Sequence, residues 1–320
     1  MPDAGYAEIV AAWQLGPPQQ ITIPDSGTVN TIVKVTLDGC EYFLRAYRHP
    51  ERAPCEHEVI AHACARDFPA VAPVPLPDGT TFLDRSGQRY ALFPRAAGQQ
   101  YARNALTAAA ITAMGTNLAA LHHALNDYPH TQARRIEIPP EQDATLAKIA
   151  HLEQTIRRRD GTDPRDSLAL THLAARRGSL QRGSDGMAID PAIFSEQVIH
   201  GDYQETNLFF NGDRVCAVID WDQTHLRSRV WEIMRVLDFV YGFAPNLCSI
   251  FLDAYRAGQP LTIGELDRGA AAYGRIQTHN LWVYEAYYLE GNQRVGQFIQ
   301  PGGFVPPAER WAQLRPYLGR

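Results

Sequence analysis

The amino-acid sequence predicts an α+β fold, in which an antiparallel β-sheet near the N-terminus is followed by a mainly helical region. Residues 21–48 hold three short runs rich in β-branched and aromatic residues, and Asp38-Gly39 between the last two is typical of a tight hairpin turn. From residue 106 to residue 125, apolar side chains instead recur at helical spacing. These patterns predict a sheet first and helices after it.

The N-terminal part is expected to contain a β-meander, one helix and two more strands. Its predicted strands cover residues 21–23, 31–37, 41–46, 81–83 and 89–93, and its predicted helix covers residues 55–66. Residues 94–98, which begin with proline and end with glycine, are expected to form a hinge. We therefore expect two lobes, residues 1–94 with the sheet and residues 95–320 with most of the helices.

The composition is typical of a soluble globular protein, with 45% hydrophobic and 20% charged residues among 320. A net charge of −5 argues against general binding to nucleic acid or to anionic membranes. No apolar run approaches the length of about 20 residues that a membrane-spanning helix needs, and no secretory signal is visible. The five cysteines include no Cys-x-x-Cys pair and are expected to be reduced thiols in a cytoplasmic protein.

The most informative stretch is residues 200–207, His-Gly-Asp-Tyr-Gln-Glu-Thr-Asn, followed at residues 219–222 by Ile-Asp-Trp-Asp. The first segment has the spacing of a kinase catalytic loop, in which the aspartate accepts the proton of the attacking hydroxyl and the asparagine holds a magnesium ion. Asn211-Gly212 predicts a hairpin turn between the segments, so the return strand brings Asp220 close to Asn207 and Asp202. A polar loop capping a hairpin in an unrelated fold is the alternative interpretation.

These residues resemble the aminoglycoside phosphotransferase / choline kinase superfamily, which has a two-lobed protein-kinase-like fold. The superfamily has His-Gly-Asp where protein kinases have His-Arg-Asp, and often Asp-Trp-Asp or Asp-Trp-Glu where they have Asp-Phe-Gly. The resemblance extends to residues 26–30, 42–45 and 115–122, and it spans residues 20–240. Within the superfamily, the homoserine-kinase-type-II-like group is the nearest subgroup.

The resemblance implies transfer of a phosphoryl group from ATP, with Mg²⁺, to a hydroxyl group of a small molecule. Asp202 would orient and deprotonate that hydroxyl, and Asn207 and Asp220 would hold Mg²⁺. Asp222 would lie nearby, on the side of the acceptor or of a second metal ion.

The nucleotide is expected to contact the N-terminal lobe. Ser26, Gly27 and Asn30 lie between two predicted strands, where a turn can direct backbone N–H groups at the ATP phosphates. Phe93 lies in the Leu-Phe-Pro segment before the hinge, whose backbone would face the adenine edge.

Arg45 occupies the position of the lysine that contacts the α- and β-phosphates in protein kinases. Its guanidinium can bind phosphate through two parallel hydrogen bonds. We expect it to pair with Glu58 on the helix over residues 55–66; Glu56 is the rival, because only one of the two can face inward. An exposed arginine on a surface strand is the alternative.

Two features favour a small-molecule acceptor. Gly201 replaces the arginine with which protein kinases commonly bind a phosphorylated activation loop, and the segment after Asp220 is short. In the C-terminal region, Trp282 and Glu285 share one face of a predicted helix over residues 279–290 and are candidates for binding a hydroxylated or amine-bearing substrate. Ordinary aromatic core packing is the alternative for this stripe.

Two other functions compete with this one. A protein Ser/Thr kinase of the same superfamily would need the activation segment that is missing here. A non-catalytic nucleotide-binding regulator would not need Asp202, Asn207 and Asp220 intact. The acceptor stays open among homoserine, choline, a sugar and an aminoglycoside, and no nucleic-acid or membrane partner is expected.

Overall fold

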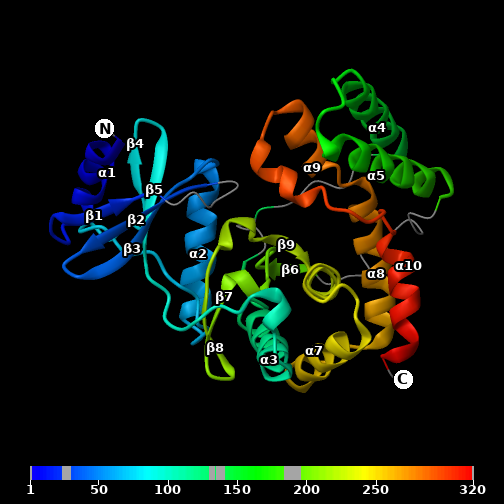
Figure 1. Cartoon of the computed structure of the whole chain (residues 1–320). Helices are drawn as coiled ribbons and strands as arrows, with labels where there is room; N and C mark the ends of the chain where they lie inside the picture. Colours follow the sequence, from blue (N-terminus) through cyan, green and yellow to red (C-terminus); the bar gives the residue numbers. More distant parts are fainter. Residues whose placement is uncertain (1, 24–29, 130–133, 135–140, 184–195, 319–320) are drawn as a thin grey trace. The chain divides into compact units, whose positions relative to one another are not determined.

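Five antiparallel strands form the main β-sheet, in the order β1-β2-β3-β5-β4 (Figure 1). The computed structural model describes residues 2–23, 30–129, 134, 141–183 and 196–318. The strands are β1 (Pro18–Thr22), β2 (Thr31–Leu37), β3 (Cys40–Ala46), β4 (Leu83–Arg85) and β5 (Gln88–Pro94). Leu37 pairs with Cys40, so Asp38 and Gly39 form the predicted turn, with φ of 46° and 75°.

The two faces of this sheet contact different helices. Val35 on β2 packs with Val10, the last residue of α1 (Pro2–Val10). On the other face, Ala91 of β5 packs with Ala53, the first residue of α2 (Ala53–Cys64). Arg45 lies directly opposite Ala91 in the β3–β5 ladder, and directly opposite residues share a face. The side chain of Arg45 therefore lies on the α2 side of the sheet.

The chain divides into two compact units. The sheet unit comprises Met1–Arg135, Glu196–Glu232 and Ile250–Pro260, and the helical unit comprises Ile136–Ser195, Ile233–Ser249 and Leu261–Arg320. The sheet unit also contains α3 (Ala108–Ala124) and two antiparallel strand pairs: β6 (Glu196–Ile199) with β9 (His225–Ser228), and β7 (Leu208–Asn211) with β8 (Arg214–Val218). The α+β prediction is confirmed, whereas the lobe boundary between residues 94 and 95 stays a prediction.

The described part of the helical unit contains helices and no strands. Its helices are α4 (Gln142–Arg157), α5 (Pro164–Gln181), α8 (Ile263–His279), α9 (Trp282–Tyr284) and α10 (Pro307–Leu314). Two further helices, α6 (Arg229–Arg235) and α7 (Pro245–Gly258), contain residues of both units. Within the described residues, no helix combines the length and the apolar content that crossing a bilayer requires.

The continuous helix predicted over residues 279–290 is wrong. Helix α8 ends at His279, Asn280 has extended backbone angles, and α9 then leads into a π-helical turn, Glu285–Leu289. The π-helical turn has more residues per turn than an α-helix, so the predicted single face is not preserved.

Candidate active site

His200 joins the two motif segments that the sequence singles out. Its Nε2 donates to the carbonyl oxygen of Ile219 at 3.0 Å, and its Nδ1 accepts from the backbone N–H of Asp202 at 3.2 Å. The backbone N–H of Ile219 in turn donates to the carbonyl oxygen of Asn207 at 3.0 Å. The predicted β7–β8 hairpin therefore returns Asp220 to the loop at residues 200–207, although its turn lies at Gly212-Asp213, one residue beyond the predicted Asn211-Gly212.

Within this loop, Asn207 and Gln204 orient the carboxylate of Asp202. The Nδ2 atom of Asn207 donates to Asp202 Oδ2 at 3.0 Å and to the Asp202 carbonyl at 2.8 Å, and Gln204 Nε2 donates to the same Oδ2 at 3.0 Å. Because the amide nitrogen of Asn207 is used in this way, its carbonyl oxygen is the atom suited to a metal ion. The sequence reasoning missed Gln204.

Gly201 and Glu232 fix the backbone of the same loop. Gly201 has φ of 82°, and a Cβ atom there would lie 2.3 Å from the carbonyl oxygen of Gln223. Glu232, which is fully buried on α6, accepts from the backbone N–H of Gly201 at 2.6 Å and of His200 at 3.3 Å. The Glu232 carboxylate thus fixes the loop by hydrogen bonds, and Gly201 allows the loop to approach Gln223 closely.

A buried histidine completes this support. Nε2 of His122, near the end of α3, lies 2.9 Å from Glu232 Oε2, and its Nδ1 lies 2.8 Å from the hydroxyl of Tyr255. Burial by itself raises the pKa of Glu232, but the hydrogen bonds from His122 and Gly201 and the nearby His200 hold it below its ordinary value. Glu232 is therefore an ionised carboxylate inside the protein.

Asp220 and Asp222 form an acidic pair after the hairpin. The side chain of Asp220 is 41% exposed, whereas Asp222 is buried and accepts from Asn30 Nδ2 at 3.2 Å. Burial and the neighbouring charge of Asp220 raise the pKa of Asp222, although Arg45 acts against them. Two neighbouring carboxylates repel each other, and a bound cation would relieve that repulsion.

Arg45 connects this acidic pair to α2. Its guanidinium donates to Glu56 Oε1 and to Asp220 Oδ1, each at 2.9 Å. Burial alone would lower the pKa of Arg45, but these two carboxylates raise it, so the guanidinium stays charged. The expected pairing with Glu58 is wrong: Glu58 is exposed and accepts a long 3.4 Å hydrogen bond from Tyr128, whereas the rival Glu56 is buried against Arg45.

The structure describes two of the four remaining residues that were predicted to bind the nucleotide. Phe93 lies on β5, with its ring centroid 5.2 Å from the Arg45 guanidinium. Asn30 lies beside Asp222 and also accepts from the backbone N–H of Arg48 at 3.0 Å. Ser26 and Gly27 lie outside the described residues.

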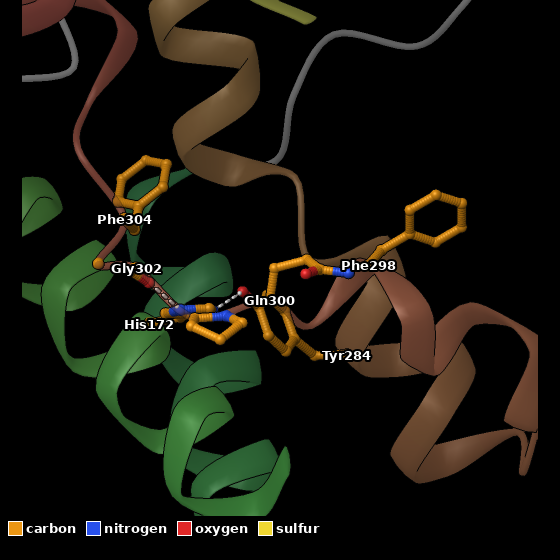
Figure 2. Close-up of a pocket in the computed structure, with 8 residues that line it drawn as sticks. His172, Tyr284, Phe298, Gln300, Gly302 and Phe304 are labelled. Atoms are coloured by element: carbon orange, nitrogen blue, oxygen red, sulfur yellow. Dashed lines mark hydrogen bonds between the residues drawn. The ribbon is translucent and has the colours of Figure 1, made fainter. Parts of the chain in front are cut away.

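The predicted acceptor residues Trp282 and Glu285 belong to the helical unit. Trp282 is 46% exposed and lies near the ring of Phe298, with 5.9 Å between ring centroids, and Glu285 pairs with Lys148 at 2.9 Å. Phe298 also lines a pocket of about 270 Å³ (Figure 2), together with His172 and Tyr284. His172 forms hydrogen bonds to the Tyr284 hydroxyl at 3.1 Å and to the Gly302 carbonyl, and these bonds fix the lining of the pocket. An acceptor role for Trp282 and Glu285 stays a prediction.

The donor set around Asp220 suits a magnesium ion. Its candidates are the interacting carboxylates of Asp220 and Asp222 and the amide oxygen of Asn207, whose backbone carbonyl is hydrogen-bonded to Ile219, and hard oxygen ligands are those that Mg²⁺ prefers. Within the described residues, no group of three or more His, Cys, Asp or Glu side chains forms a separate metal site.

A family model describes most of this chain. The model of the phosphotransferase enzyme family matches residues 20–271. The chain therefore belongs to this family, which confirms its resemblance to aminoglycoside phosphotransferases; the subgroup stays a prediction. A search of curated proteins found no match.

Solved structures share the fold at low sequence identity. An aminoglycoside phosphotransferase from Alicyclobacillus acidocaldarius is 14% identical, with a TM-score of 0.67 over 99% of this chain and 95% of that one. A spectinomycin phosphotransferase in complex with ADP and spectinomycin is 14% identical, with a TM-score of 0.68 over 98% and 93%. An amicoumacin kinase in complex with AMP-PNP, Ca²⁺ and Ami is 14% identical, with a TM-score of 0.64 over 94% and 96%. These likenesses confirm the kinase-like phosphotransferase fold.

Proposed function

We propose that this protein is an ATP- and Mg²⁺-dependent phosphotransferase that transfers the γ-phosphoryl group to a hydroxyl group of a small molecule. The observation that carries the proposal is the hydrogen-bonded group of Asp202, Asn207 and the segment 219–222, in a chain that belongs to the phosphotransferase enzyme family. Phosphoryl transfer depends mainly on positioning and charge neutralisation, and this group is suited to both.

Each residue of the group has a distinct task in the proposal. Asp202 accepts the proton of the acceptor hydroxyl, while Asn207 and Gln204 keep its carboxylate in one orientation. Asn207 and Asp220 would hold Mg²⁺, with Asp222 beside them, and the ion would supply positive charge to the phosphates. Arg45, which stays charged between Glu56 and Asp220, faces the phosphates.

A small acceptor is favoured over a protein. Helix α6 begins at Arg229, shortly after Asp222, which leaves no room for a long activation segment that could bind a peptide. The relatives named above include enzymes whose structures contain spectinomycin or amicoumacin, both small molecules.

An acceptor screen with γ-labelled ATP tests the proposal. Amino alcohols, hydroxy amino acids, sugars and aminoglycosides are incubated with the protein, MgATP and label, and labelled product is separated from inorganic phosphate. We expect an acceptor-dependent product whose rate falls by about 10²–10⁴-fold in Asp202→Ala, because a general base contributes that much. The thermal shift caused by MgATP should remain in this variant. Near wild-type turnover in Asp202→Ala would sink the assignment of the base.

A further inference from the structure

Several buried polar atoms just beyond Asp222 have no hydrogen-bond partner among the described residues. They belong to four residues of the sheet unit: Arg134 Nε, Thr224 Oγ1, His225 Nε2 and Arg227 Nε. His225 and Arg227 are two residues apart on β9, and residues two apart on a strand share a face. Buried groups without partners are rare in proteins and point to a missing ligand or water. The proposed function uses none of these atoms.

Arg134 is held beside the acidic pair by its backbone and its side chain. Its carbonyl oxygen accepts from the backbone N–H of Leu226 at 2.7 Å, and its guanidinium donates to the carbonyl oxygen of Gln223 at 3.3 Å. Nδ1 of His225 donates to the same carbonyl at 2.6 Å. The guanidinium of Arg134 thus contacts the residue that follows Asp222.

The charge of Arg134 is poorly balanced. Within the described residues, neither Arg134 nor Arg52, which precedes α2, forms an ion pair with a carboxylate. Burial and the charge of Arg52 lower the pKa of the Arg134 guanidinium, whereas Asp222 and Glu51 raise it. In the proposed function the negative charge of Asp222 lies beside the metal ion. The positive charges of Arg134 and Arg52 are then not balanced by Asp222.

Arg227 adds a positive charge that Glu196 partly offsets, whereas His225 is neutral and adds none. The Arg227 guanidinium lies 5.7 Å from the ring centroid of Trp231, and its charge acts on His225 together with that of Arg134. Burial, and then these two arginines, lower the pKa of His225 to about 4, so it is neutral at pH 7. With Nδ1 donating to Gln223, its Nε2 is left as an acceptor.

We propose that Arg134, assisted by Arg52, binds an anionic group of the acceptor, a carboxylate or a phosphate. The planar guanidinium of arginine binds either group through parallel hydrogen bonds. The inference rests on the proposed function and narrows it: the acceptor is a hydroxy acid or a phosphorylated alcohol. A polyamine such as an aminoglycoside would bring like charge to these arginines.

Sulfate is the probe for the anion site itself. Its binding is measured by calorimetry at constant ionic strength on the full chain loaded with Mg²⁺ and AMP-PNP, so that the nucleotide phosphates already occupy their own site. We expect binding to wild type, weakened about 10–100-fold in Arg134→Gln and in Arg52→Gln, because a charge-assisted hydrogen bond is lost. The sulfate affinity of Arg134→Lys should lie between that of wild type and that of Arg134→Gln. Arg66→Gln, an exposed arginine paired with Asp127 beyond the other end of α2, is the matched control and should bind as wild type does.

The outcomes separate the possible sources of the anion. No sulfate binding to the loaded protein, or equal binding by Arg134→Gln and wild type, would overturn the proposal. Binding that disappears when AMP-PNP is present would also overturn it, because the arginines would then serve the nucleotide phosphates. Arg52→Gln retains the half-buried Arg134 side chain, so the test stands even if Arg134→Gln folds poorly.

Matched acceptor pairs then test the substrate class. ADP formation is compared for D-glycerate and glycerol, for L-homoserine and 3-aminopropan-1-ol, and for kanamycin. We expect turnover with acid members only, and a raised KM for the acid with an unchanged KM for ATP in Arg134→Gln. Turnover of glycerol, the amino alcohol or kanamycin in preference to the acids would overturn this inference and leave the proposed function standing. Sulfate binding that depends on Arg134, without phosphoryl transfer to any hydroxyl, would support the anion site and overturn the proposed function.

Discussion

Replacing Gly201 by alanine tests how tightly the backbone is packed next to the proposed base. Two costs are expected. The first is conformational: φ is 82°, and a left-handed conformation costs a residue with a Cβ atom about 1–2 kcal/mol. The second is steric, since the new Cβ would lie 2.3 Å from the carbonyl oxygen of Gln223 and 3.0 Å from His225 Nδ1. A backbone carbonyl cannot rotate away, so the loop must shift, at about 1–3 kcal/mol for overpacking.

Gly87 provides a matched control for the first cost. Its φ is 77°, but a Cβ atom there would meet nothing within 4 Å. Gly87→Ala should therefore lose only the conformational cost of about 1–2 kcal/mol, and Gly201→Ala the sum of both, about 2–5 kcal/mol. The difference between the two variants isolates the close approach of Gly201 to Gln223.

Urea unfolding of the wild type and both variants measures these costs, with turnover of the accepted substrate as the second readout. Asp202 follows Gly201 directly, and a displacement of about 1 Å can lower a rate about 10²-fold. We expect such a loss in Gly201→Ala and none in Gly87→Ala. Equal destabilisation of the two variants, together with wild-type turnover in Gly201→Ala, would refute the reasoning about the loop.

Three further predictions concern charged residues of the site. Glu232→Gln should lower the free energy of unfolding by about 2–4 kcal/mol at pH 7, because a buried backbone N–H loses its acceptor. The pKa of Glu232 is depressed in the folded state, so its contribution is present above the unfolded value of about 4.3 and is lost as the pH falls through the folded pKa; a difference from wild type that did not shrink below this pH would contradict the role of the charge. Asp220→Asn should raise the Mg²⁺ concentration needed for half-maximal rate, and superimposable Mg²⁺ titrations would show that Asp220 is not a ligand. Arg45→Ala should lower stability by about 3–5 kcal/mol, since Glu56 is left buried and unpaired, and adding Glu56→Gln should recover part of it; Arg45→Lys should retain some of the thermal shift caused by MgATP, and the loss of that shift in Arg45→Lys would argue against a phosphate role.

The parts of the site that the sequence predicted are those fixed by local structure. The hairpin predicted from Asn211-Gly212 reverses one residue later, at Gly212-Asp213, because Asn211 still pairs with Arg214, and this reversal brings Ile219 to Asn207. The support of the loop is different in kind. Glu232 is 31 positions from Gly201, and His122 is 110 positions from Glu232, so their contacts depend on how α3 and α6 pack in the folded protein. No local pattern specifies such a pairing.

The error over the partner of Arg45 has a different origin, because the sequence did contain the signal that would have prevented it. Residues 56, 59, 60 and 63 follow the spacing i, i+3, i+4, i+7 and so share one face of α2. Apart from Glu56 these are Val59, Ile60 and Ala63, all buried, whereas position 58 is turned about 200° away from position 56 at about 100° per residue. The apolar residues therefore fix the phase of the helix and place Glu56 inward. With side chains only 10% and 2% exposed, Arg45 and Glu56 form a buried ion pair, and breaking such a pair is costly because it strands a charge. Any loss of nucleotide binding in Arg45→Ala must accordingly be compared with the double variant that also carries Glu56→Gln, in which Glu56 leaves no buried unpaired charge and the lost interactions are the ion pair with Asp220 and the proposed contact with the phosphates.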